Sequence, residues 1–241
     1  MTISILAIDE KTGRMGGAAA TGSLCVGGWV LRGGPESGMS ASQGTAPSTL
    51  WGEDVLAAMR AGQSAAAAVA SVTGADAGRA HRQLAALDTA GGTGAFTGAE
   101  SVAHAGALEV PGVVVAGNML AGPEVIEAAL DGFRAAAAMP FPERLMGALG
   151  AAAAAGGDAR GLLSAALLVV GRDMAPLTLR IDHSVNPLAA LADLYLVSQA
   201  DPYHGWTGVV PVLDDPWRAP ASEEVPEVPE PIVEAEPAIR R

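Results

Sequence analysis

The chain has 241 residues, half of them apolar, which suits one large domain with a substantial core. Its net charge of −12 and its scattered cations argue against nucleic-acid binding, because phosphate contacts need clustered Lys and Arg. The single cysteine, Cys25, excludes an intramolecular disulfide, and the longest strongly apolar run, residues 162–171, is too short to span a bilayer.

The start of the chain carries Asp9 and Glu10 where a signal peptide would carry a basic and then an apolar segment. Together with the lone cysteine, this favours a reducing compartment. We therefore expect a cytoplasmic protein, with no membrane or nucleic-acid partner, that forms a homo-oligomer.

The predicted elements begin with two strands at 2–8 and 15–22, which a turn at 9–14 joins. A third strand is predicted at 37–44, a helix at 49–61, and a second helix that Ser64 caps and that runs to about Val72. Further along we expect a strand at 82–89, a tight turn at 91–92 into 94–98, a buried strand within 110–120, helices at 123–137 and 141–155, strands at 162–170 and 176–182, and a helix at 187–198.

Strands and helices therefore follow one another in blocks and do not alternate. This order predicts an α+β fold with two antiparallel sheets between helical layers. We expect one domain over residues 1–200 and an irregular extension over 201–218, which holds Trp206 and Trp217. Residues 219–241, with five prolines and six glutamates, are typical of a disordered tail.

Thr2 is the first candidate for chemistry. Methionine aminopeptidase removes Met1 efficiently before a small residue, which leaves a threonine with a free amine. An α-amine has a pKa of about 7.7–8.0, so it can take the proton of the threonine hydroxyl. One residue then serves as nucleophile and base; the alternative is an ordinary strand threonine.

Two further candidates have equally plain alternatives. Ser4 shares a strand face with Thr2, because side chains alternate with period two, and it is either a pocket residue or a solvent-facing or cross-strand hydroxyl. Asn118 ends the apolar run VVVAGN, where its amide either donates to an oxyanion at the mouth of a sheet or fixes its own turn.

The loop AGGDARG brings Asp158 and Arg160 together, either to bind a carboxylate through Arg160 or as a surface ion pair. Arg82 and Gln83 open a strand and are either pocket residues or, in the alternative, Arg82 is a buried structural arginine. The four histidines are scattered, and the sequence has neither a phosphate-binding GxxxxGK nor a GxSxG motif. We therefore expect no metal and no organic cofactor.

An ordered series of segments carries a family resemblance. The matching segments are TISILAIDEKTGRMGGAAATG, SQG, LAAMRAGQSAAAAV, HRQLAALD, AFTG, VAGNMLAG, ERLMGAL, AGGDARG, SAALLVV and LRID. In this order they resemble a bacterial family, domain of unknown function 1028, over about residues 2–198. The chain departs from the family pattern at Leu163, where the family has glutamine, and at His183, where it has an acid.

That family is similar to the N-terminal nucleophile (Ntn) hydrolases, whose fold is a four-layer αββα sandwich. The resemblance implies that Thr2 attacks the carbonyl of a small linear or cyclic amide and forms an acyl-enzyme. We take Asn118 as the best oxyanion donor, and the further substrate-binding candidates are Ser4, Thr21, Gln43, Asp158 and Arg160. The alternative is a catalytically inactive ligand-binding or assembly protein on the same fold, since Gly22 and Ser23 stand where such hydrolases often carry a cation near the nucleophile.

Overall fold

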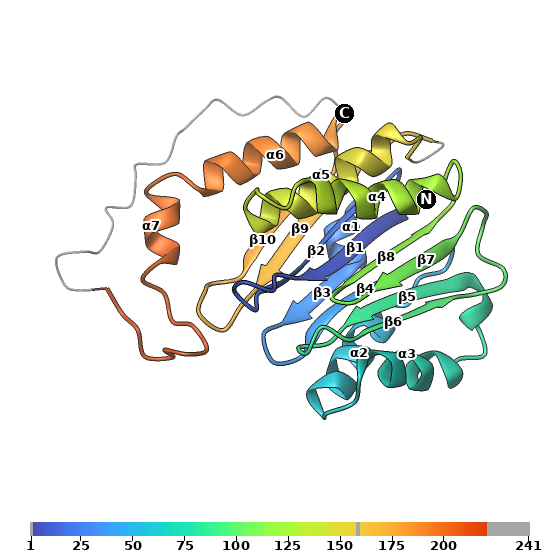
Figure 1. The fold of residues 1–241 in the computed structure, drawn as a ribbon, viewed down its shortest axis with the longest axis horizontal. Coiled ribbons are helices and arrows are strands. Elements are labelled where there is room, and N and C mark those ends of the chain that lie inside the picture. The colour runs from blue at the N-terminus through green and yellow to red at the C-terminus, as the bar shows by residue number, and fades with distance from the viewer. Residues whose placement is uncertain (1, 158–159, 221–241) are drawn as a thin grey trace, which may run out of the picture.

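A computed structural model describes residues 2–157 and 160–220 of the chain. These residues form two antiparallel β-sheets that pack face to face, and helices cover both outer faces (Figure 1). The expected α+β fold, with two antiparallel sheets in a sandwich between helical layers, is confirmed.

The larger sheet has six strands, and the strand that begins with Thr2 lies inside it. The strand order is β10 (Leu177–Ile181), β9 (Ser164–Val170), β2 (Met15–Thr21), β1 (Thr2–Ile8), β8 (Val113–Asn118) and β7 (Gly106–Val110). The smaller sheet has the order β3 (Leu31–Gly34), β4 (Gly38–Gly44), β5 (Arg82–Leu87) and β6 (Thr93–Thr97). Strand β1 thus pairs with β2 on one side and with β8 on the other, and its backbone is held from both sides.

The alternation of side chains along β1 decides which residues face which layer. Ile3 and Ile5 pack in the core beneath α4 (Glu124–Ala135), α5 (Phe141–Ala154) and α6 (Pro187–Ser198), whereas Leu6 packs between the two sheets. Because side chains alternate with period two, Thr2 shares the face of Leu6. The hydroxyl of Thr2 therefore points toward the smaller sheet.

On the other side of the molecule, α2 (Thr49–Arg60) and α3 (Ala65–Gly74) cover the smaller sheet (Figure 1). Ser64 caps α3 as predicted, because its Oγ accepts a hydrogen bond of 3.3 Å from the N–H of Ala67. Trp51 of α2 is buried and meets Phe96 of β6 edge to face, with 5.9 Å between the ring centroids. Through these contacts, α2 and α3 form the fourth layer, on the outer face of the smaller sheet.

The two sheets approach each other closely because their facing strands carry small side chains. Every residue of β2, whose sequence is MGGAAAT, is buried. A Cβ on Gly17 would lie only 2.7 Å from Cδ2 of Leu6, so no side chain fits there without a shift of its neighbour. The glycine- and alanine-rich composition of this strand is what allows the close packing.

Several short elements were not predicted. They are α1 (Val26–Trp29), β3, the 3₁₀ helix η1 (Arg79–His81), β7 and α7 (Tyr203–Thr207). β7 is an edge strand whose side chains alternate between partly buried and exposed, so it lacks the apolar run that marks a buried strand. α7 lies within the expected extension, and most of the expected tail, residues 221–241, lies outside the described residues.

Two glycines with positive φ give a matched test of this packing. Gly38 has φ +93°, and a Cβ there would lie 2.2 Å from the carbonyl oxygen of Leu87, whereas Gly62 has φ +96° and open space around it. Alanine at either position meets the same left-handed backbone strain. We expect Gly38→Ala to lower the free energy of unfolding by about 1–3 kcal/mol more than Gly62→Ala, as measured by urea denaturation. Equal losses in the two variants would contradict this close approach.

Candidate active site

Thr2 meets two of the predicted site residues across its own sheet. Its Cα lies opposite that of Thr21 on β2 and that of Asn118 on β8, and directly opposed residues point to the same face of a sheet. The Thr2 hydroxyl donates to Oγ1 of Thr21 over 3.2 Å, and this oxygen also accepts a bond of 3.3 Å from the N–H of Ser23. Thr2 as a residue is half-buried.

Three buried side-chain amides lie between the sheets near this strand end, and we call them the amide cluster: Gln43, Gln83 and Asn118. The Oε1 atom of Gln83 accepts from Nε2 of Gln43 over 2.7 Å and from Nδ2 of Asn118 over 3.1 Å. Nε2 of Gln83 in turn faces the carbonyl oxygens of Gly106 and Gly117, at 2.9 and 3.0 Å. Because carbonyl oxygens only accept, this arrangement fixes the orientation of the Gln83 amide.

Gln43 connects the amide cluster to the backbone of β1. Its Nε2 also lies 3.2 Å from the carbonyl oxygen of Ala116 and 3.4 Å from that of Thr2. Its Oε1 atom is buried and has no hydrogen-bond partner among the described residues. Gln43 therefore presents a buried acceptor close to the end of the strand that carries Thr2.

The other predicted substrate-binding residues are placed differently. The hydroxyl of Ser4 is buried and donates to the carbonyl oxygen of Ala116 over 3.4 Å, a cross-strand contact. Asp158 lies outside the described residues. Arg160 is exposed on the loop that leads into β9.

That loop lies at the same end of the sheet as Thr2, because both of its ends are tied there. At its start, the carbonyl oxygen of Gly157 accepts from the N–H of Ala121 over 3.3 Å, three residues beyond Asn118. At its end, the N–H of Leu163 donates to the carbonyl oxygen of Thr21 over 2.8 Å. The structure thus brings Thr2, Thr21, Asn118, Gln43 and the loop of Arg160 to one end of the sandwich.

Arg82 and Gln83 are adjacent in sequence but have separate roles. Arg82 forms an ion pair with Asp76, donates to the carbonyl oxygen of Ala46 over 2.9 Å and lies over the ring of Trp51. This agrees with the structural alternative for the arginine. Gln83 is the centre of the amide cluster. From the sequence it was predicted only to lie at the start of a strand, as a candidate pocket residue.

The side chains of Thr2, Thr21 and the amide cluster include no group that ionises near neutral pH. A base for chemistry at Thr2 must therefore come from its own amine or from a group outside this set. Over residues 2–157 and 160–220, no three His, Cys, Asp or Glu side chains are grouped so as to hold a metal ion. Nor does that part of the chain contain a helix of the length and apolarity needed to cross a bilayer.

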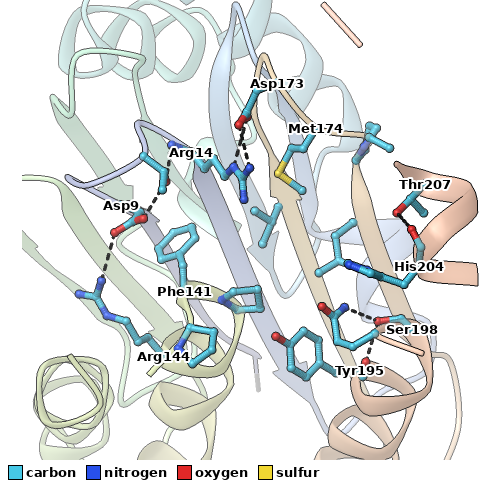
Figure 2. A pocket seen from close by; sticks show the side chains of 18 of the residues that line it. Asp9, Arg14, Phe141, Arg144, Asp173, Met174, Tyr195, Ser198, His204 and Thr207 are labelled. Atoms are coloured by element: carbon cyan, nitrogen blue, oxygen red, sulfur yellow. Dashed lines mark hydrogen bonds and ion pairs between the residues drawn. The ribbon is translucent and has the colours of Figure 1, made fainter. Parts of the chain in front are cut away.

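A cavity of about 650 Å³ lies at the opposite end of β1 and does not include the residues around Thr2. Its wall contains Asp9, the residue directly after β1, together with side chains of α5, α6, α7 and the turn between β9 and β10 (Figure 2). The sequence offered no signal for this cavity, because its residues are far apart in the chain and come together from several helices, strands and turns and from the expected extension.

The amide cluster gives a stability prediction. Gln83→Glu keeps the shape of the side chain but replaces the donor that faces two backbone carbonyl oxygens with an acceptor. We expect it to lower the free energy of unfolding by about 2–5 kcal/mol at neutral pH, because buried groups lose their partners. The exposed Gln63 supplies the control, since Gln63→Glu should change stability by less than about 0.5 kcal/mol. Urea denaturation measures both, and similar values for the two variants would show that the cluster does not hold the sheets together.

Comparison with known proteins gives the chain a family but no activity. A family model described as "Family of unknown function (DUF1028)" matches residues 2–191. The crystal structure of protein SPO2555 from Silicibacter pomeroyi, assigned to the same family model, is 50% identical in sequence and has a TM-score of 0.87, with coverage of 90% of this chain and 98% of that one. No curated protein matches the chain. The chain therefore belongs to the DUF1028 family, a family of unknown function.

Proposed function

We propose that the protein is an amide hydrolase in which Thr2, once Met1 is removed, is an N-terminal nucleophile. The observation that carries the proposal is the position of the Thr2 hydroxyl. It is half-buried at the end of a central strand, held by Thr21 at 3.2 Å, and opposed across the sheet by the amide of Asn118. A nucleophile needs such a fixed but reachable position, and a rigid strand provides it better than a loop.

The reaction then follows from the groups at this site. The free amine of Thr2 takes the proton of the Thr2 hydroxyl while Oγ1 attacks the carbonyl carbon of the amide. The resulting tetrahedral adduct collapses as the C–N bond breaks, and the leaving amine receives the proton. Water then hydrolyses the ester on Thr2, with the amine acting as base again, and the product acid leaves.

The negative oxygen of the tetrahedral adduct needs a hydrogen-bond donor. Nδ2 of Asn118 carries two N–H bonds, and one of them serves Gln83. In the proposal the other donates to the oxyanion. Because Gln83 also fixes the amide of Asn118 in place, the donor is preorganised and needs little rearrangement in the transition state.

The surroundings of Thr2 favour a small substrate. The strand end lies between the two sheets, and backbone hydrogen bonds tie Gly157 and Leu163 beside it, so a compact linear or cyclic amide suits it better than a folded protein. Arg160 is an exposed cation on that loop, and guanidinium groups bind carboxylates through paired hydrogen bonds. We therefore propose an amide that carries a carboxylate near the bond to be cleaved.

A second candidate function is ligand binding without catalysis. It is favoured by the separation of the 650 Å³ cavity from Thr2 and by Gly22 and Ser23, which supply no cation beside the nucleophile. An inactive relative could also retain Met1. The state of the N-terminus and the reactivity of Thr2 therefore separate the two functions.

Thr2 should react with an electrophile that acylates hydroxyl nucleophiles. We expect the purified protein to lack Met1 and to gain one adduct on Thr2 when treated with a β-lactone, as read by intact-mass and peptide mass spectrometry. Thr2→Ala also permits Met1 removal, so this variant differs from the wild type only by the loss of the side-chain hydroxyl and methyl groups. It should gain no adduct.

Ser4 gives the matched control for this labelling, because it is a hydroxyl on the same face of the same strand. Ser4→Ala should be acylated like the wild type. Retention of Met1 in all molecules from the native host, or an adduct on Ser4 in place of Thr2, would disprove the proposed nucleophile.

The role of Asn118 can be measured before a natural substrate is known. Removal of one oxyanion donor lowers a turnover rate by ~10²–10³, and acylation of Thr2 by the β-lactone passes through the same kind of adduct. We expect Asn118→Ala to slow acylation by a factor in this range, whereas Asn186→Ala, at an exposed position, should acylate at the wild-type rate. A folded Asn118→Ala protein that is acylated at the normal rate would reassign Asn118 to structure.

A further inference from the structure

The cavity at the far end of β1 has the size of a small-molecule site. Ligand pockets commonly occupy about 300–1,000 Å³, and this cavity holds about 650 Å³. Figure 2 shows that its wall is assembled from parts distant in sequence, with Arg14 beside Asp173 at one side, Arg144 reaching Asp9 at another, and His204 and Tyr195 across from them. Thr2 and Asp9 are seven residues apart on an extended strand, which separates the two sites by roughly 23 Å.

The wall is positively charged although the protein is strongly acidic. Four cationic side chains and two carboxylates line the cavity, a net charge of +2, in a chain whose net charge is −12: Lys11, Arg14, Arg144 and Arg218 against Asp9 and Asp173. Lys11 is the only lysine of the chain. Such a local reversal of sign favours the binding of anions at this cavity.

The two carboxylates hold guanidinium groups in place. Asp173 binds Arg14 through bonds of 2.7 and 3.2 Å, and this contact keeps the pKa of the Asp173 carboxyl below its usual value. Asp9 is buried and already accepts a bond of 2.7 Å from the hydroxyl of Thr12, while its distance to Arg144 is longer, at 3.5 Å. The charge of Arg144 is thus only loosely compensated.

Arg144 is also fixed from its other side. Its guanidinium lies over the ring of Phe133, 4.2 Å from the ring centroid, and its Nε is buried without a hydrogen-bond partner among the described residues. Stacking and the Asp9 contact together hold a cation at the cavity wall in one orientation. A cation held in this way is prepared to bind an anionic group.

Much of the remaining wall is apolar or aromatic. Phe141, Met174 and Leu177 contribute hydrocarbon surface, and Tyr195 of α6 adds a phenol whose pKa is raised by burial and by the nearby Glu143. The phenol therefore stays neutral at physiological pH and can donate a hydrogen bond. An apolar wall with a few fixed polar groups is typical of sites that bind amphipathic organic molecules.

We propose that this cavity binds a small organic anion with an aromatic or branched apolar body, with the anionic group at Arg144 and Lys11 and the body against Phe141, Met174 and Tyr195. The inference does not depend on the proposed hydrolase function, because none of these residues lies near Thr2. It assigns the protein a second site, remote from the candidate nucleophile, for a ligand of defined charge and shape.

The test uses anilinonaphthalene sulfonate, an aromatic probe with one anionic group, titrated by fluorescence into the full chain. We expect saturable binding at one site. Arg144→Met should weaken the affinity by about tenfold or more, the loss expected for one charged hydrogen bond. Lys11→Gln, at an exposed position, should weaken it by up to about fivefold. Met174→Trp should abolish binding, because the larger side chain fills the cavity.

Matched controls lie outside the cavity. Arg134→Met removes an exposed cation from α4 and should leave the affinity within about twofold of the wild type, as should Thr2→Ala, so the two proposals can fail separately. If circular dichroism shows that Arg144→Met does not fold, Lys11→Gln and Met174→Trp decide. The inference is overturned if these variants bind the probe as the wild type does, or if the cationic dye thioflavin T binds the cavity at least as tightly.

Discussion

The side-chain amide of Gln83 is the contact on which the site end of the sandwich depends. Elsewhere the two sheets meet through apolar side chains, whose contacts are not directional. Gln83 projects from the smaller sheet, accepts from Gln43 and Asn118, and donates to the carbonyl oxygens of Gly106 and Gly117 in the larger sheet. A buried amide with both ends satisfied in this way fixes one sheet against the other.

This constraint also determines what chemistry the strand end can perform. The side chains packed between the sheets at this end are three neutral amides, so this part of the surroundings of Thr2 is polar but uncharged. Donors are already oriented, and no carboxylate is present among these side chains to repel an incoming anion or to compete with it for the donors. The arrangement suits stabilisation of a negative oxygen better than proton transfer, which the proposed reaction assigns to the α-amine. The same feature makes the region sensitive to any change that introduces charge.

The parts of the fold that depend on local sequence patterns could be predicted from the sequence. The strands at 2–8 and 15–21 and the helices around α2, α4 and α6 follow from apolar periodicity and capping residues, and the order of blocks indicated the layers. The juxtaposition of Thr2, Thr21 and Asn118 depends on the pairing register of three strands, which no local pattern contains. The family resemblance indicated the fold and the candidate residues but not this register. The central position of Gln83 and the remote cavity were missed because both arise from long-range packing.

The place of β1 in the middle of its sheet has a consequence for the order of synthesis. A ribosome adds about 5–20 residues per second, so the codon for Asn118 is read roughly 6–23 s after that for Thr2. During that interval β1 can form a hairpin with β2, but its other neighbour, β8, does not yet exist. The amine end of β1 is therefore most open to a processing enzyme on the nascent chain, before the second neighbour and the amide cluster enclose it. The rate of Met1 removal is therefore best measured on the nascent chain during translation and not on the folded protein.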